Sequence, residues 1–101
     1  MTLFTLTLAA LASWYGYPYH GQRTASGEIY NMNAMTAAHP TLPFGTKLKV
    51  CSNRTKRCAV VRINDRGPYE GNRSIDISKE AAKRIGLYSE GVGKVSITRV
   101  N

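Results

Sequence analysis

Acidic residues are scarce in this chain, which has six Asp and Glu against fourteen Lys and Arg and a formal charge of +8 at pH 7. Such a positive chain favours encounter with a polyanion or an acidic surface, so nucleic acid, anionic lipid and the acidic polymers of a cell wall are the candidate partners. Signatures of metal and nucleotide chemistry are missing: there is no HExxH, HxH, Walker loop, GxSxG or dinucleotide fingerprint. We therefore expect neither a metal site nor a cofactor.

The apolar run at the N-terminus, residues 1–12, is too short to span a bilayer, which takes about 20 residues. It is uncharged and ends in Ala-Leu-Ala, a small-x-small pattern that signal peptidase accepts, but no positive side chain precedes Arg23. We predict that residues 1–12 are a signal peptide or its clipped remnant and that residues 13–101 are the mature domain, without stable membrane insertion. The alternative is that residues 4–8, in which Thr and Leu alternate, form an extra edge strand.

Cysteine is nearly absent, since Cys51 and Cys58 are the only two. Two cysteines cannot complete a tetrahedral zinc site, and their spacing is not the CxxC redox motif. They bracket a polar stretch between two strand-like segments, 47–50 and 59–61, which predicts a hairpin with a disulfide across its arms. Such a bridge needs an oxidising compartment, so we expect a secreted or periplasmic protein. The alternative is two free buried thiols in a cytosolic protein.

No repeat, low-complexity tract or Gly/Ser linker divides residues 13–101, so we expect a single domain. Five short segments have β-branched or aromatic residues in near alternation and are the predicted strands: 13–17, 47–51, 59–64, 74–77 and 94–100. One helix is predicted from the N-cap Ser78 to Gly86, and a second, weaker one over 33–38 before Pro40. This pattern is typical of a mainly β barrel or sandwich with one or two short helices.

Three of the six carboxylates lie at a helix start or in turns: Glu70, Glu80 and Glu90. The candidates for chemistry are the other three, Glu28, Asp65 and Asp76. Asp65 follows a strand, where scaffolds commonly present functional groups, although the same position suits an Asx turn. Glu28 has no helix to cap, but an exposed loop residue is the ordinary reading. Asp76 points to solvent or into a cleft, depending on which face of its strand is buried.

Aromatic residues cluster early in the chain, at Trp14, Tyr15, Tyr17, Tyr19 and Tyr30. Planar rings stack on sugar faces, so the cluster suggests a saccharide platform, with core packing as the competing explanation. A lone histidine such as His39 is more often a hydrogen-bonded structural residue than a catalyst.

Six blocks follow one another between residues 13 and 100: Ser13-Trp14-Tyr15-Gly16, Thr24-Ala25-Ser26-Gly27-Glu28, Thr36-Ala37-Ala38-His39, Leu42-Pro43-Phe44-Gly45-Thr46, Val61-Arg62-Ile63-Asn64-Asp65-Arg66-Gly67-Pro68, and Ile75-Asp76-Ile77-Ser78 with Ala81-Ala82. In this order and spacing they resemble the rare-lipoprotein-A-like family. The resemblance implies a six-stranded double-psi β-barrel, a fold shared with expansins, barwin-like proteins and some endoglucanases. It also implies lytic transglycosylation, in which the β-1,4 bond from N-acetylmuramic acid to N-acetylglucosamine is cut without water, leaving a 1,6-anhydro-muramoyl end.

By position, the resemblance places the family's catalytic Asp on Asp65, its essential Glu on Glu28 and its supporting His on His39. An acid that matters in the related endoglucanases and expansins falls on Asp76. We expect Asp65 to protonate the leaving oxygen and then, as a base, to deprotonate the attacking 6-hydroxyl. Glu28 would stabilise the cation or tune Asp65, and His39 would hydrogen-bond one of them. Besides Asp76, the expected groove lining is Ser13, Tyr15, Thr24, Ser26, Asn64 and Arg66.

The expected partner is therefore the glycan strands of peptidoglycan, bound by a monomer in the cell wall. The N-terminal run ends without the lipoprotein cysteine, so no lipid anchor is expected, and we expect no C-terminal glycan-binding module of the kind that many members carry. An expansin-like module that binds or loosens wall polysaccharide is the alternative, and it would leave no anhydro-muramoyl products. Nucleic-acid binding rests on the positive charge alone and is not expected.

Overall fold

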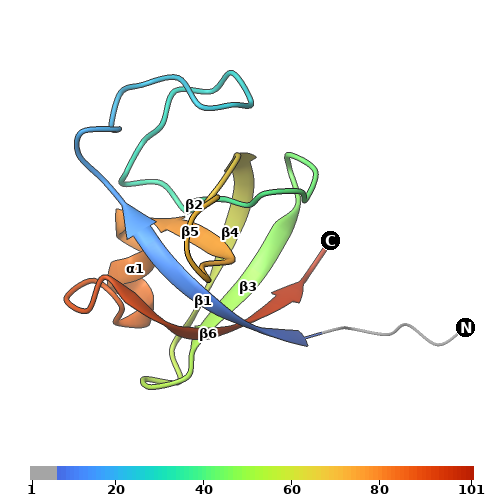
Figure 1. Cartoon of the computed structure of the whole chain (residues 1–101), viewed down its shortest axis with the longest axis vertical. Helices are drawn as coiled ribbons and strands as arrows, with labels where there is room; N and C mark the ends of the chain where they lie inside the picture. Colours follow the sequence, from blue (N-terminus) through green and yellow to red (C-terminus); the bar gives the residue numbers. More distant parts are fainter. Residues whose placement is uncertain (1–6) are drawn as a thin grey trace, which may run out of the picture.

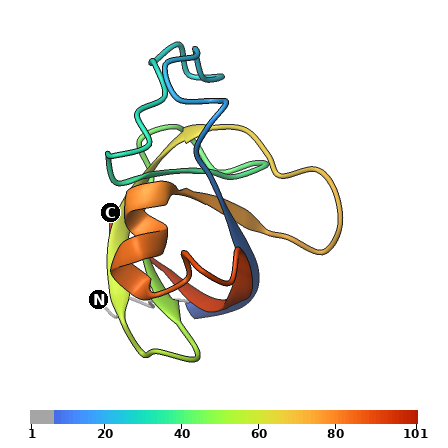
Figure 2. The ribbon, with the colours of Figure 1, turned by 90° about the vertical axis from the view of Figure 1, so that its left-hand side faces the viewer.

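The computed structural model describes residues 7–101, which form a closed barrel of six strands with one helix packed outside it (Figures 1 and 2). The elements in chain order are β1 (Thr7–Tyr15), β2 (Thr36–Ala38), β3 (Lys47–Ser52), β4 (Cys58–Asp65), β5 (Ile75–Ser78), α1 (Lys79–Ile85) and β6 (Val92–Arg99). Around the barrel the strand order is β1-β5-β2-β4-β3-β6. The structure thus confirms the predicted six-stranded, mainly β barrel. No helix within the described residues is long and apolar enough to cross a membrane.

The barrel combines two parallel strand pairs, β1 with β5 and β2 with β4, with antiparallel pairing elsewhere. Inward-pointing side chains of the strands fill the interior, and the buried face of α1 adds three core residues. The buried core includes Ala12, Leu48, Val50, Val61, Ile63, Ile75, Ile77, Ala81, Ala82, Ile85 and Val95. The long connection between β1 and β2 lies over one end of the barrel (Figure 1). The β1–β2 connection can therefore contribute residues to a site at this end of the barrel.

Strand β1 begins earlier than the sequence predicted, because residues 7–12 are part of it. Ala12 is fully buried and is paired with Ile75 of β5 on one side and Gly93 of β6 on the other. Residues 7 and 8, which belong to the alternative edge strand, continue β1 and pair with β6. Cleavage after Ala12 would remove the first six residues of this strand. The structure does not test the predicted signal peptide, which stays a prediction. Residues 1–6 of that segment lie outside the described part of the chain.

The weak helix predicted over residues 33–38 is wrong, because residues 36–38 form β2. This three-residue strand lies between β4 and β5 and is buried along its whole length. The helix-forming preference of its two alanines is overridden by hydrogen bonding on both edges, which only the folded barrel supplies.

The predicted helix α1 is confirmed at both ends. The Ser78 hydroxyl oxygen accepts a hydrogen bond from the Ala81 N–H at 3.2 Å, as an N-cap does. The same hydroxyl donates to the Ala34 carbonyl at 2.6 Å, which ties the helix start to the β1–β2 connection. Gly86 ends the helix with φ of 81°, a left-handed conformation that favours glycine.

The predicted disulfide between Cys51 and Cys58 is confirmed and joins the arms of the β3–β4 hairpin. The hairpin also covers the C-terminal end of α1. The Thr55 hydroxyl donates to the Ile85 carbonyl at 2.6 Å, and the Arg54 guanidinium donates to the Gly86 carbonyl at 2.7 Å. These contacts satisfy carbonyls that the helix itself leaves unpaired.

Loss of the disulfide should lower the free energy of unfolding by about 2–3 kcal/mol, since the bridge closes a short loop in the unfolded chain. For a domain of this size the melting temperature should fall by about 10–20 °C. Thermal unfolding followed by circular dichroism, with and without reductant, measures the change. The Cys51→Ser/Cys58→Ser variant should melt at the lower temperature in both conditions, and equal melting of the oxidised and reduced wild type would contradict the prediction.

Candidate active site

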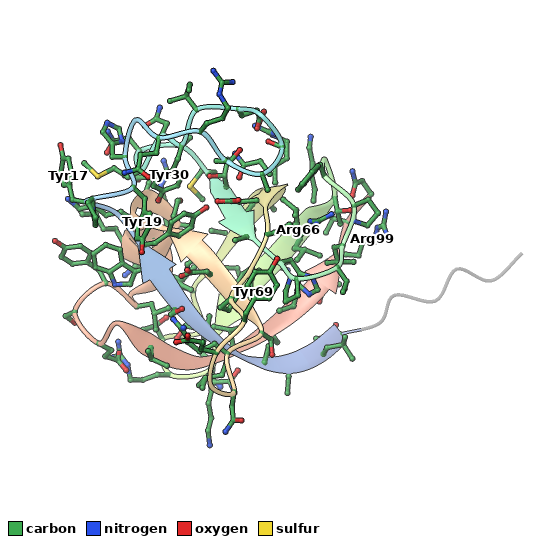
Figure 3. The ribbon with its side chains drawn as sticks, turned by 45° about the horizontal axis from the view of Figure 1, so that its top comes forward. Tyr17, Tyr19, Tyr30, Arg66, Tyr69 and Arg99 are labelled. Atoms are coloured by element: carbon green, nitrogen blue, oxygen red, sulfur yellow. A yellow bond between two sulfur atoms is a disulfide. The ribbon has the colours of Figure 1, made fainter. Side chains whose placement is uncertain are left out.

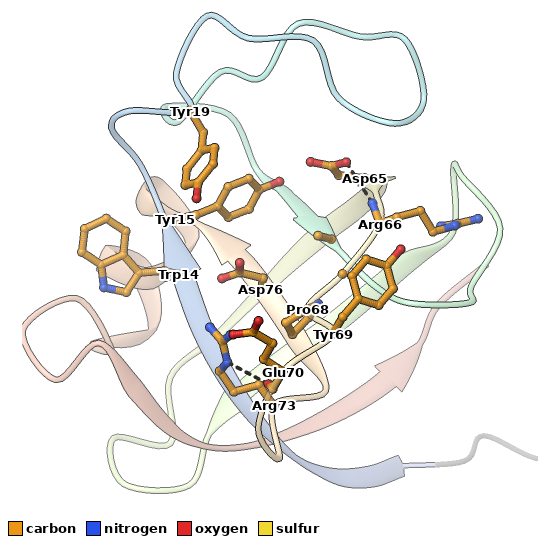
Figure 4. Close-up of a pocket in the computed structure, with 12 residues that line it drawn as sticks. Trp14, Tyr15, Tyr19, Asp65, Arg66, Pro68, Tyr69, Glu70, Arg73 and Asp76 are labelled. Atoms are coloured by element: carbon orange, nitrogen blue, oxygen red, sulfur yellow. Dashed lines mark hydrogen bonds between the residues drawn. The ribbon is translucent and has the colours of Figure 1, made fainter.

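An open pocket of about 440 Å³ lies at the end of the barrel that carries the long β1–β2 connection (Figure 4). Its lining combines aromatic rings and charged side chains, and its residues come from β1, the β1–β2 connection, β2, β4, the β4–β5 loop and β5. The lining residues are Trp14, Tyr15, Tyr19, Ala38, Asp65, Arg66, Gly67, Pro68, Tyr69, Glu70, Arg73 and Asp76. Tyr19 lies to one side of this end of the barrel, and Arg66 and Tyr69 lie to the other (Figure 3). Three rings of the predicted cluster, those of Trp14, Tyr15 and Tyr19, therefore line the pocket, whereas Tyr17 and Tyr30 do not. Tyr69 adds a ring from outside the predicted cluster.

Two carboxylates face the pocket from strands on either side of β2. Ala38 is paired with Asp65 of β4 on one side and with Asp76 of β5 on the other. Neighbouring strands lie about 4.8 Å apart, so the two acids are separated by about 10 Å between their backbones. Both line the same pocket, and the methyl group of Ala38 leaves the space between them open. Pairing through β2 thus brings together two acids that are eleven residues apart in sequence.

Asp76 is the more enclosed of these acids, and its pKa is raised above the ordinary range. Burial is the main cause, and the negative charge of Asp65 adds to it. The Ser13 hydroxyl, which donates to Asp76 Oδ1 at 3.0 Å, and the nearby Arg73 act in the opposite direction. Arg73 in turn donates to the Ser13 oxygen at 3.1 Å. This network holds Asp76 in place, while burial keeps the pKa of Asp76 raised.

Asp65 is oriented by backbone groups from two loops. Its Oδ1 accepts hydrogen bonds from the N–H of Ala25 and the N–H of Arg66, each at 2.9 Å. No residue in 7–101 donates a hydrogen bond to its Oδ2. The Arg66 side chain turns away, donates to the Leu42 carbonyl at 2.9 Å and lies over the Phe44 ring at 4.1 Å. The carboxylate is therefore fixed through one oxygen, and the other is available to a ligand.

Tyr15 lies between Asp76 and the long connection, with its hydroxyl pointing toward Asp65 (Figure 4). The ring stacks on Tyr30 at 4.2 Å and meets Tyr19 edge-on at 6.0 Å. The hydroxyl is buried and has no hydrogen-bond partner within 3.5 Å among the described residues. Burial raises the pKa of Tyr15, and the charge of Asp65 raises it further. At neutral pH the hydroxyl is therefore protonated, and it points toward Asp65.

Comparison with known proteins assigns the sequence of this chain to a family. A family model described as lytic transglycolase matches residues 7–97. The chain belongs to the lytic transglycolase family. The match covers every strand but the end of β6, and it includes both pocket acids.

Curated relatives of this lytic transglycolase domain have consistent names. It is 59% identical to the probable endolytic peptidoglycan transglycosylase RlpA of Synechocystis sp. over 86% of the chain, and 47% identical to the endolytic peptidoglycan transglycosylase RlpA of Neisseria meningitidis over 88%. The chain spans only 27% and 37% of the length of these relatives.

Solved structures with the same fold include other classes of protein. The expansin of Clavibacter michiganensis superposes with a TM-score of 0.75 at 19% identity, and covers 95% of this chain with 51% of its own. The Streptomyces papain inhibitor also has a TM-score of 0.75, at 20% identity over 95% of this chain and 96% of its own. At these identities the likeness establishes the double-psi β-barrel fold alone.

Glu28, predicted as a catalytic residue, lies outside the pocket of the lytic transglycolase domain. Arg62 Nη1 binds both of its carboxylate oxygens at 2.9 Å. The hydrogen bond from Arg62 lowers the pKa of Glu28, and one from the Asn64 side chain lowers it further. Glu28 lies in the same loop as Ala25, whose N–H donates to Asp65. The carboxylate of Glu28 itself forms an ion pair with Arg62.

The His39 side chain makes no hydrogen bond to either pocket acid. Its Nδ1 accepts from the backbone N–H groups of Thr41 and Leu42, both at 3.1 Å, so the ring organises the following turn. Burial lowers the pKa of His39, and the nearby Arg66 lowers it further. The expected hydrogen bond to a carboxylate is not present, and the contact to Asp65 is made by the His39 backbone N–H, which donates to the Asp65 carbonyl at 3.2 Å.

Of the predicted groove residues, Tyr15, Arg66 and Asp76 line the pocket, and Ser13 is buried directly behind Asp76. The other three shape the loop beside Asp65. The hydroxyls of Thr24 and Ser26 are hydrogen-bonded at 2.9 Å, and the Ser26 N–H donates to the Asn64 carbonyl at 3.3 Å. Sequence reasoning missed the pocket positions of Tyr69, Glu70 and Arg73. The Gly-Pro turn before Tyr69 was the available signal, since it follows a candidate acid directly.

At pH 7, Asp76→Asn should raise the melting temperature of the domain. The folded pKa of Asp76 is higher than its unfolded value of about 4, so ionisation disfavours the folded state at pH values above the folded pKa. That penalty disappears as the pH falls below the unfolded pKa. The gain from Asn should therefore be present at pH 7 and shrink toward pH 3, as measured by thermal unfolding at both values. A variant that is equally destabilised at both would contradict this account.

Proposed function

We propose that this domain cleaves the glycan strands of peptidoglycan as an endolytic transglycosylase and leaves 1,6-anhydro-muramoyl ends. The observation that carries the proposal is the pair of carboxylates, Asp65 and Asp76, on either side of Ala38 in an open pocket lined by aromatic rings. Glycosidic cleavage requires a proton donor held protonated near neutral pH and a second group that handles charge or protons. The names of the relatives support the same reaction and substrate.

The reaction divides between these two acids the roles that the sequence assigned to Asp65 alone. Asp76, whose pKa is raised, donates its proton to the glycosidic oxygen as the bond from the muramoyl anomeric carbon to that oxygen breaks. Asp65 then accepts the proton of the muramoyl 6-hydroxyl as that oxygen bonds to the anomeric carbon. Transfer of the proton from Asp65 back to Asp76 restores the starting state. No water is consumed, because the nucleophile belongs to the substrate.

Glu28 and His39 act in this proposal as positioning residues. The ion pair of Glu28 with Arg62 holds the 24–28 loop, and this loop orients Asp65 through the Ala25 N–H. His39 holds the turn at Thr41 and Leu42, whose carbonyl anchors the Arg66 side chain. The rings of Trp14, Tyr15, Tyr19 and Tyr69 would bind the sugars.

We further propose that the domain works as a monomer on cell-wall glycan in a secreted or periplasmic location. The disulfide supports an oxidising compartment, and the charge of +8 supports encounter with an acidic wall polymer.

The test is to incubate residues 7–101 with peptide-free peptidoglycan strands and to identify the soluble products by mass spectrometry. Anhydro-muramoyl ends are the expected result. Reducing ends would make the domain a hydrolase. Intact strands that nevertheless retain the protein would make it an expansin-like binding module. Both of these results overturn the proposed reaction.

A further inference from the structure

The aromatic surface of the pocket continues beyond it to the loop that follows α1. Trp14 lines the pocket and stacks on Tyr88, with ring centroids 5.0 Å apart and an angle of 27° between the planes. The Trp14 indole N–H also donates to the Tyr88 carbonyl at 3.1 Å. The Tyr88 side chain is exposed, and so this pair presents a continuous apolar surface from the acids to the outside of the helix.

Two lysines of α1 lie over the same ring. Lys79 Nζ is 5.7 Å and Lys83 Nζ is 5.3 Å from the Tyr88 centroid. They are four residues apart, so they share one face of the helix. No salt bridge engages either ammonium group among residues 7–101, and the one carboxylate of the helix, Glu80, is paired with Arg84 at 2.9 Å. Two ammonium groups without a carboxylate partner in the described part of the chain therefore lie beside the Trp14–Tyr88 pair, and this pair extends to the pocket.

The position of Lys79 is not explained by folding. It is the first residue of α1, where the helix dipole favours negative side chains and disfavours a cation. A cation–aromatic contact at an exposed site contributes only about 0.5–1 kcal/mol. A ligand that brings negative charge to this face would give both lysines a partner and would still contact the exposed rings.

We propose that Lys79 and Lys83, together with the Trp14–Tyr88 pair, bind a carboxylate of the glycan strand whose sugar occupies the pocket. This inference rests on the proposed function, because that function supplies the substrate. Each muramoyl residue of such a strand carries a lactyl group, which is a free carboxylate in peptide-free strands. In peptide-bearing strands the lactyl group is an amide, and the carboxylates are those of the peptide. In both cases the ligand is a carboxylate on the muramoyl side chain.

The experiment compares three proteins: the wild type, Lys79→Gln/Lys83→Gln and the matched control Lys47→Gln/Lys49→Gln, which removes the same charge from β3 on another part of the barrel. Each is assayed on peptide-free strands, on the same strands with lactyl carboxylates converted to methylamides, and on peptide-bearing strands. KM and kcat are taken from anhydro-muramoyl release, and co-sedimentation measures binding in parallel.

On peptide-free strands, KM and the dissociation constant should rise about tenfold for Lys79→Gln/Lys83→Gln, with little change in kcat and none for the control. Methylamide strands should weaken the wild type by the same factor and the variant no further. A variant that loses affinity only for peptide-free strands identifies the lactyl carboxylate as the ligand, and a loss on peptide-bearing strands identifies a peptide carboxylate.

Equal affinity of the wild type and the variant for all strands would overturn the carboxylate site while leaving cleavage intact. If no protein releases anhydro-muramoyl ends, the proposed reaction fails, and co-sedimentation still decides the site. An equal loss of affinity in the control variant would show a general effect of net charge and would also overturn the proposed carboxylate site.

Discussion

Asp65→Asn and Asp76→Asn should each slow the release of anhydro-muramoyl ends by about 10²–10⁴-fold, the usual contribution of a positioned acid or base. Asn keeps the shape of the side chain and can still accept the hydrogen bonds that Ser13 gives to Asp76 and that two backbone groups give to Asp65. What it removes is the titrating proton. Product release from peptide-free strands, quantified by mass spectrometry, measures the loss.

The pH dependence separates the two acids. Asp76 must be protonated to act as the donor, so the rate of the wild type should fall as the pH rises through the raised pKa of Asp76. The residual activity of Asp76→Asn should lack this alkaline limb, whereas that of Asp65→Asn should keep it. Rate profiles between pH 4 and 9 decide the assignment, and an alkaline limb that persists in Asp76→Asn would exclude Asp76 as the donor.

Glu70→Gln is the matched control, because Glu70 lines the same pocket and is exposed. It should retain wild-type activity within about threefold, in line with the small effects of exposed surface substitutions. Glu28→Gln should cause a smaller loss than either Asp variant, since Glu28 acts on Asp65 only through the 24–28 loop. A loss at Glu28 equal to that at Asp65, with the fold intact, would return Glu28 to the catalytic group.

A chain that begins at Ser13 should melt at least about 10 °C below one that begins at Thr7, a loss of about 2 kcal/mol or more. Residues 7–12 supply six of the seven residue pairs between β1 and β6. Their removal also exposes the edge of β6 and uncovers core residues around the fully buried Ala12. Thermal unfolding of the two chains by circular dichroism measures the difference.

The chain that begins at Thr7 is the control, because it keeps every described residue. Equal melting temperatures would show that the barrel closes without the first half of β1. In that case a leader ending at Ala12 would be compatible with a stable mature domain.

Local patterns in the sequence were sufficient for most of the barrel, but they located only residues 13–15 of the nine-residue strand β1. The strand segments, the helix between Ser78 and Gly86, and the bridge between Cys51 and Cys58 each depend on residues that are close in the chain. Strand β2 was missed because its three residues have no strand pattern of their own. They are held extended by β4 and β5, whose positions depend on the whole fold.

The candidate site shows the same limit. Asp65 and Asp76 were each selected from the sequence, but their placement on either side of Ala38 follows from one parallel and one antiparallel pairing. No spacing in the chain indicates this. Glu28 and His39 have the residue types of catalysts, yet the partners that occupy them, Arg62 and the turn at Thr41, become visible only in three dimensions.

Ala38 is the residue of β2 that is paired with both Asp65 and Asp76, so the size of its side chain determines how much space is left between the two carboxylates. A valine there, with two more methyl groups than alanine, would project into the gap between Asp65 and Asp76, the space that the proposed reaction requires for the sugar. The outer aromatic rings and the strand pairing would be unaffected. If the proposed reaction holds, one substitution at Ala38 should therefore separate glycan binding from glycan cleavage.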